Sequence, residues 1–301
     1  MATSLTVTGT GTPIPSADRA GPGALVRYDD LTLQFDAGRS TVQRLAGANV
    51  WIPDLTALFV THHHSDHVVG LTDIVLTHWV MDRTDNNAPL PVIGPRGDVS
   101  QYLETLLDGW ERDIEVRADH AGRDTSPAID IVAFDIPDDP TEVWRHGDVV
   151  VSAGQVRHEP CPNAVGYRVD TPDGSVAITG DTRVCDEVAA LADGVDVLVY
   201  EAMRFSFFET LPERRRYVTD YHADTRLIGE QAARLGVPKL VLTHLIPAPT
   251  SEDERQLFID EVRAGGYDGD LVVADDLYTT AVGSGGLPDT GAIIQPAAEQ
   301  T

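Results

Sequence analysis

Four residues of the kinds that bind metal ions occupy one short segment of the chain. They form the pattern H-x-H-x-D-H, at His62, His64, Asp66 and His67. This pattern is too specific to be a chance feature of such a composition. Alternate residues of an extended segment point the same way, so His62 and His64 should converge on one point. Asp66 and His67 can then face a second point nearby. Imidazole and carboxylate ligands without thiolate suit zinc, with manganese or iron as alternatives.

Three more potential metal ligands come at the ends of predicted strands. Each directly follows a short apolar or β-rich run: His158, Asp181 and His244. Loops after strand ends are where α/β folds gather their functional side chains. We therefore expect these three residues to join the first four and to complete two adjacent metal sites.

The elements that must position these residues alternate between strand and helix patterns. Strands are predicted at 5–9, 24–28, 31–35, 55–60, 91–93, 141–146, 148–157, 165–169, 175–179, 195–200, 240–243 and 270–274. Helices are predicted at 41–48 (with Ser40 as N-cap), 68–81, 98–110, 184–191, 223–235 and 252–264, and 112–127 is predicted to be irregular. The simplest α/β (α+β) architecture for this order is two sheets packed face to face with helices outside, a four-layer αββα sandwich.

The chain shows no internal linker, so residues 1–282 are predicted to form a single domain. Residues 283–301, rich in Gly, Pro, Ala and polar residues, are predicted to be a disordered tail. No apolar run approaches the roughly 18 residues of a membrane span, and the N-terminus does not read as a signal peptide. Two cysteines give no disulfide framework. These features predict a cytoplasmic protein.

The charge of the chain is strongly acidic. Lys and Arg number 22 against 48 Asp and Glu, which gives a formal net charge of −26, and Lys239 is the single lysine. A protein that neutralises several phosphates of a nucleic acid needs a basic surface. The charge therefore disfavours a large nucleic acid as partner, although a small anionic substrate at metal ions stays compatible with it.

The order of these motifs resembles the ribonuclease-Z-like branch of the metallo-β-lactamase superfamily over about residues 5–280. The resemblance rests on Gly9-Thr-Gly-Thr, H-x-H-x-D-H, His158, the Gly180-Asp181 turn, Tyr-Glu201-Ala, Tyr-His222-Ala-Asp and Leu-Thr-His244. It implies that one metal ion is held by His62, His64 and His158, and a second by Asp66, His67 and His244, with Asp181 bridging both.

The same resemblance implies a hydrolytic mechanism. Two metal ions would lower the pKa of a bridging water and present hydroxide at neutral pH. Glu201 would hold the ring of His222, which would face the leaving group. Asp66 would also accept a proton or hydrogen bond from the attacking water.

Two departures from the tRNA-processing enzymes of that branch favour a small substrate. Those enzymes usually carry a lysine in the N-terminal loop and a long arm before the bridging aspartate. Here Arg19 is present but the lysine is not, and one short turn precedes Gly180-Asp181. The segment V-T-D-Y-H-A-D-T, which ends at Thr225, looks more like the arylsulfatase-like group.

The favoured prediction is therefore a hydrolase of a small phosphodiester or sulfate ester, with Arg19 or Arg183 binding the anion. A lactonase or thioesterase is an alternative, with Phe207 among the residues that would wall a more apolar pocket. A tRNA 3′-processing ribonuclease is less favoured, and a non-enzymatic metal-binding protein is the contrast from another class. Residues 204–216 could form a lid or a dimer contact, and a homodimer fits the resemblance because related enzymes are often dimers.

Overall fold

The computed structural model of the protein describes residues 2–82 and 88–283, and within these ranges the strands form two seven-stranded sheets. The first sheet has the order β14 (Thr279–Ala281), β1 (Ser4–Gly9), β2 (Gly23–Tyr28), β3 (Leu31–Phe35), β4 (Ala57–Phe59), β5 (Leu90–Pro95), β6 (Ile129–Phe134). The second has the order β13 (Asp270–Val273), β12 (Lys239–Ile246), β11 (Val197–Met203), β10 (Gly174–Ile178), β9 (Val165–Thr171), β8 (Val149–Gln155), β7 (Thr141–His146).

Both sheets combine an antiparallel part with a parallel part. In the first sheet β14, β1, β2 and β3 pair antiparallel, and β3 to β6 pair parallel. In the second sheet β7 to β10 pair antiparallel, and β10 to β13 pair parallel. Parallel neighbours end at the same edge of a sheet, so the loops after β3 and β4 lie together, as do those after β10, β11 and β12.

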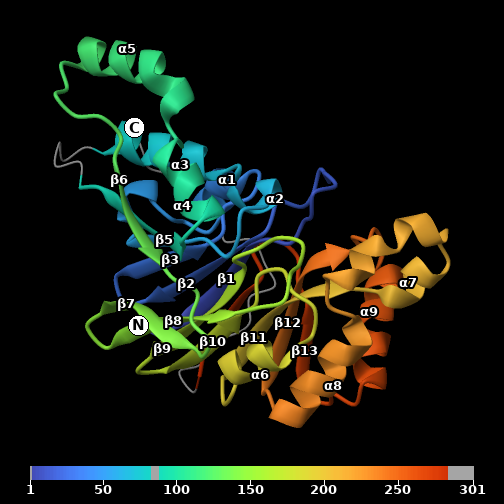
Figure 1. Ribbon diagram of the computed structural model, residues 1–301. Coiled ribbons are helices and arrows are strands. Elements are labelled where there is room, and N and C mark those ends of the chain that lie inside the picture. Colours follow the sequence, from blue (N-terminus) through green and yellow to red (C-terminus); the bar gives the residue numbers. More distant parts are fainter. Residues whose placement is uncertain (1, 83–87, 284–301) are drawn as a thin grey trace.

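Three apolar clusters hold four layers together. One cluster, which includes Phe35, Phe59 and Tyr167, lies between the two sheets. The outer face of the first sheet is covered by α1 (Thr41–Gly47), α3 (Leu71–Met81) and α4 (Asp98–Glu104). The outer face of the second is covered by α6 (Asp186–Leu191), α8 (Thr225–Leu235) and α9 (Glu252–Ala264). Figure 1 shows these helix sets on opposite sides of the sheets, which confirms the predicted αββα sandwich.

The segment predicted to be irregular instead contains a helix, α5 (Glu111–Ala121). None of its residues is buried, and Figure 1 shows it standing away from the sheets. A helix that buries no face needs no apolar stripe, so the hydrophobic pattern gave no signal of it. The strands β6 and β14 and the short helix α7 (Phe205–Glu209) were also not predicted.

The predicted helix 68–81 instead begins at Leu71 as α3, and Gly70 lies between it and a short helix that was not predicted, α2 (Ser65–Val68). A Cβ atom at Gly70 would come within 2.3 Å of the carbonyl oxygen of Gly38, so this close approach of two loops requires glycine. The predicted helix 98–110 likewise ends early, at Glu104, before a separate 3₁₀ turn at Asp108–Trp110. Ser40 does precede α1, but its side chain makes no capping hydrogen bond.

No helix among the described residues is long and apolar enough to cross a membrane. Of the predicted tail, residues 284–301 lie outside the described residues, and the domain boundary at 282 remains a prediction.

Candidate metal centre

The seven predicted metal ligands converge at the edge where strand ends of the two sheets meet. His62 and His64 follow β4, Asp66 and His67 lie in α2, His158 comes after β8, Asp181 comes after β10, and His244 lies within β12. All are buried except His64, which is half-buried. The φ angle of His244 is +43°, in the left-handed region that non-glycine residues seldom occupy. Strain of this kind is a frequent feature of functional sites.

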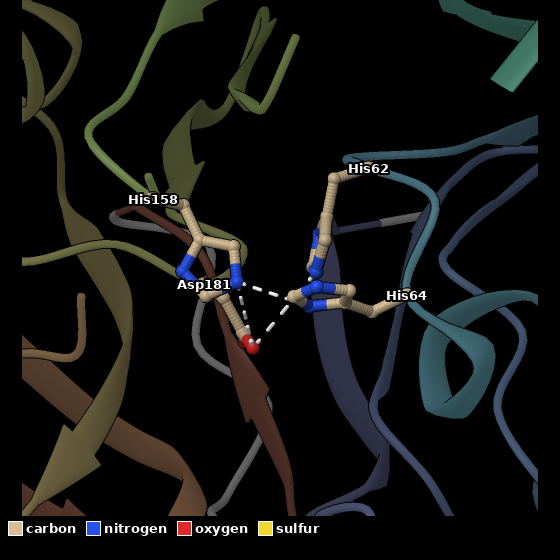
Figure 2. A group of neighbouring side chains, drawn as sticks. All are labelled: His62, His64, His158 and Asp181. Carbon is tan, nitrogen blue, oxygen red and sulfur yellow. Dashed lines mark hydrogen bonds and ion pairs between the residues drawn. The ribbon is translucent and has the colours of Figure 1, made fainter. Parts of the chain in front are cut away.

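One group of ligand atoms is supplied by His62, His64, His158 and Asp181, and all of these atoms lie within 4.8 Å of one another. Figure 2 shows the side chains of this group turned toward a common point, His62 and His64 from one segment and His158 and Asp181 from two others. Asp181 Oδ2 lies 3.9 Å from His62 Nε2 and 3.8 Å from His158 Nε2, and His158 Nε2 lies 3.1 Å from His64 Nδ1. These atoms could hold one metal ion.

A second group, Asp66, His67 and His244, lies beside the first and also keeps its ligand atoms within 4.8 Å of one another. Asp66 Oδ2 is 3.8 Å from His67 Nε2 and 3.4 Å from His244 Nε2. Asp181 faces this group too, with its Oδ1 3.2 Å from His67 Nε2 and its Oδ2 3.4 Å from His244 Nε2. The carboxylate of Asp181 therefore lies between the two groups, where a bridging ligand is needed.

Four buried atoms of these groups have no hydrogen-bond partner within the described part of the chain: His62 Nε2, His67 Nε2, Asp181 Oδ1 and His244 Nδ1. Leaving such atoms unpaired costs roughly 1–3 kcal/mol each, so buried polar atoms are normally satisfied. A pair of divalent cations would satisfy the first three of these atoms. The residues present thus fit two divalent metal ions.

Asp36, which the sequence analysis missed, sets the tautomers of two of the histidines. Its Oδ2 accepts a hydrogen bond from His67 Nδ1 at 2.8 Å and another from the Thr61 hydroxyl at 2.8 Å. Because the Thr61 hydroxyl donates its proton to Asp36, it can only accept a hydrogen bond from His62 Nδ1, which lies 2.9 Å away. Both rings therefore carry their proton on Nδ1 and turn the lone pair of Nε2 toward the site. Asp36 directly follows β3, so the strand-end rule could have found it.

The pKa shifts of His62, His64 and Asp181 favour metal binding. Burial would lower the pKa of His67, but the carboxylates of Asp181 and Asp36 raise it well above its usual value, so a cation would have to displace a proton from this ring. Burial lowers the pKa of His62 well below its usual value, and burial likewise lowers the pKa of His64. Burial would raise the pKa of Asp181, but the neighbouring His244 and His67 hold it well below the ordinary value. Neutral imidazoles and an ionised carboxylate are the forms that bind cations.

Glu201 and His222, predicted to act on the leaving group, form a buried pair beside the ligands. Glu201 Oε1 lies 2.8 Å from His222 Nδ1 and also accepts a hydrogen bond from the backbone N–H of Thr182 at 2.9 Å. Burial would lower the pKa of His222, but the charge of Glu201 and this hydrogen bond raise it to about 9. His222 can therefore hold a proton at neutral pH.

The three residues predicted to bind the substrate lie outside the cluster of potential metal ligands. Arg19 has a nearly buried side chain and binds the Thr10 hydroxyl, the Ala274 carbonyl and the carboxylate of Asp275. Arg183 is half-exposed and lies 3.7 Å from Glu159. Phe207 lies on α7, where 38% of it is exposed. None of them belongs to the groups of described residues that could bind a metal ion.

The comparisons with known sequences agree with this geometry. A family model described as "Beta-lactamase superfamily domain" matches residues 32–245. A ribonuclease Z of Mycobacterium bovis (strain BCG / Pasteur 1173P2) is 35% identical over 280 residues, which cover 92% of this chain and 98% of the relative. A ribonuclease Z of Mycobacterium avium (strain 104) is 36% identical with the same coverage.

Solved structures share the fold at low sequence identity. The metallo-β-lactamase fold protein YhfI from Bacillus subtilis has a TM-score of 0.72 and 20% identity, covering 93% of this chain and 99% of its own. Human tRNase Z, short form, has a TM-score of 0.65 and 21% identity, with the same coverage. The chain belongs to the metallo-β-lactamase superfamily of hydrolases, as a relative of ribonuclease Z.

These relatives overturn one expectation. The acidic composition predicts that a large nucleic acid is an unlikely partner, yet relatives that match nearly the whole chain are named ribonuclease Z. The expectation was wrong because net charge sums over the whole surface, whereas a nuclease meets its substrate at one local site. Cations held at that site change the local potential without appearing in the sequence charge.

Proposed function

We propose that this chain is a dinuclear metal-dependent phosphodiesterase that cleaves RNA. The observation that carries the proposal is the Asp181 carboxylate between two groups of ligand atoms. The near full-length similarity to ribonuclease Z supports RNA as the substrate rather than a small ester. It replaces the sulfate ester, lactone and thioester alternatives as the first substrate to test.

His62, His64 and His158 would hold one ion, Asp66, His67 and His244 the other, and Asp181 both. Zinc suits these ligands best, with manganese or iron as alternatives. When bound, such a pair supplies Lewis acidity and lowers the pKa of water between the ions. Asp36 orients His62 and His67 through the hydrogen bonds described above, so the ligand atoms are fixed before binding.

The proton for the leaving oxygen would come from His222. Glu201 binds its Nδ1 and favours the protonated ring, which leaves the other ring nitrogen free to donate. A positioned acid of this kind contributes roughly 10²–10⁴-fold to the rate. Asp66, next to both Nε2 atoms of its group, is placed to accept a hydrogen bond from the attacking water.

A substrate panel tests this proposal. The purified protein would be incubated with a precursor tRNA carrying a 3′ extension, bis-p-nitrophenyl phosphate, p-nitrophenyl sulfate and a simple lactone. We expect cleavage of the RNA and of the phosphodiester, abolished by chelation and restored by added metal ions. Cleavage of the lactone or the sulfate alone, with the RNA untouched, would refute RNA cleavage as the function.

A further inference from the structure

A row of aromatic rings leads from the metal centre to the surface. The ring of Tyr221 lies 4.8 Å from that of His222 and 5.4 Å from that of His158, measured between centroids. The ring of Tyr217 follows at 6.4 Å from Tyr221. Tyr217 is 63% exposed, so its ring is open to solvent. The row therefore joins the reaction centre to solvent.

Two arginines stand immediately before this row, in the 3₁₀ turn Glu213–Arg215. Arg214 and Arg215 are exposed. Neither side chain forms an ion pair with another residue in the described ranges 2–82 and 88–283. Arg216, the next residue, instead binds the carbonyl oxygens of Leu211 and Glu209 and fixes the turn. In a chain of net charge −26, these two adjacent arginines place positive charge on one exposed turn.

Exposed aromatic rings and free arginines in one groove are how proteins bind single-stranded nucleic acid, with bases on the rings and phosphates at the cations. In the described part of the chain, the stretch before Asp181 holds no inserted segment that could contact RNA. β9 and β10 fill that stretch and are joined directly by a tight turn. Contacts to RNA must therefore come from another part of the rim.

We propose that Tyr217 and Tyr221 stack on bases, and Arg214 and Arg215 contact phosphates, of the single-stranded RNA next to the bond that is cleaved. This inference rests on the proposed function, because it assumes an RNA substrate. Tyr221 receives the nucleotide nearest the metal centre and Tyr217 the next one outward. The residues named here bind the substrate and take no part in the chemical step.

Binding of a labelled single-stranded RNA with phosphorothioate linkages, which resist cleavage, tests the stacking role by fluorescence anisotropy on the metal-loaded protein. Tyr217→Ala should weaken binding roughly tenfold, and Tyr217→Phe should retain it because the ring remains. Trp110→Ala is the matched control, since Trp110 is 45% exposed but lies beside α5, away from α7 (Figure 1). Equal binding by wild type and Tyr217→Ala would overturn the proposal.

The salt dependence of the same binding tests the arginines. The double variant Arg214→Ala/Arg215→Ala should lower the slope of log K against log salt by about 1.4, because each single-strand phosphate contact contributes roughly 0.7. Arg112→Ala/Arg117→Ala removes the same charge from α5 and should leave the slope unchanged. An equal decrease of the slope in both double variants would mean that only the net charge of the protein matters. That result would overturn the proposal that Arg214 and Arg215 contact phosphates.

Hydrolysis of bis-p-nitrophenyl phosphate separates this inference from the proposed function. That substrate is too small to reach Tyr217, so Tyr217→Ala should cleave it at the wild-type rate while its RNA cleavage falls. If the wild type cleaves neither substrate, the proposed function fails. If the wild type cleaves both substrates and Tyr217→Ala cleaves and binds RNA as well as Tyr217→Phe does, only the proposed stacking of bases on Tyr217 fails.

Discussion

The metal centre and the adjoining rim, residues 204–221, are built in opposite ways. Six of the seven potential metal ligands are buried, and three of the histidines have their Nδ1 hydrogen-bonded to groups outside the ligand set: His62, His67 and His158. The rim consists of α7 and two 3₁₀ turns, and none of the residues in these three elements is buried. The comparison separates a fixed site for chemistry from an exposed surface for the substrate. Substitutions in the metal centre should therefore cause large losses of activity, and substitutions in the rim should cause smaller, graded losses.

The largest loss is expected at Asp181, the residue between the two ligand groups. Asp181→Ala should reduce phosphodiester hydrolysis by at least about 10³-fold, because two-metal sites supply several kcal/mol of transition-state stabilisation and each 1.36 kcal/mol is tenfold in rate. Elemental analysis of the variant should show less bound metal than the wild type. Full metal content together with full activity would remove Asp181 from the centre.

A loss of activity without loss of metal is expected at the acid pair. Glu201→Gln and His222→Asn should each lower kcat by roughly 10²–10⁴-fold, because the leaving oxygen loses its proton donor. Metal content, measured on the same samples, should match the wild type. A variant that loses metal to the same degree as Asp181→Ala would show that the pair acts as ligands instead.

An intermediate effect is expected at Asp36, which orients two ligands but touches no metal. Asp36→Asn should weaken metal affinity roughly 10–100-fold, because His62 and His67 lose the carboxylate that fixes their tautomers. Competition with a chromogenic chelator measures this affinity. Asp30→Asn, an exposed change in the same hairpin, is the control and should have no effect. Unchanged affinity in Asp36→Asn would contradict the tautomer argument.

The smallest effect is expected at Phe207 in the rim. Phe207→Ala should change the free energy of unfolding by no more than about 0.5 kcal/mol, because the side chain is 38% exposed. Phe59→Ala, in the fully buried core between the sheets, should cost about 3–5 kcal/mol. Urea denaturation followed by circular dichroism measures both. Similar losses in the two variants would show that the rim is packed against the body.

The sequence predicted the layered fold and the seven converging ligands because both follow local rules. Apolar runs mark buried strands, and H-x-H-x-D-H and the residues after strand ends follow from spacing alone. Asp36 escaped notice because its role depends on contacts with Thr61 and His67, which only the folded chain brings together. Helix α5 escaped because it buries no residue. The prediction that a large nucleic acid is an unlikely partner was wrong because a net charge of −26 does not give the local potential at one site.

Anomalous diffraction from crystals of the protein, recorded at the zinc, iron and manganese edges, tests the central claim most directly. The account predicts two anomalous peaks on either side of Asp181, one among His62, His64 and His158 and one among Asp66, His67 and His244. The edge at which they appear identifies the metal. No peak at this cluster in crystals grown with each of these metals would contradict a dinuclear metal hydrolase.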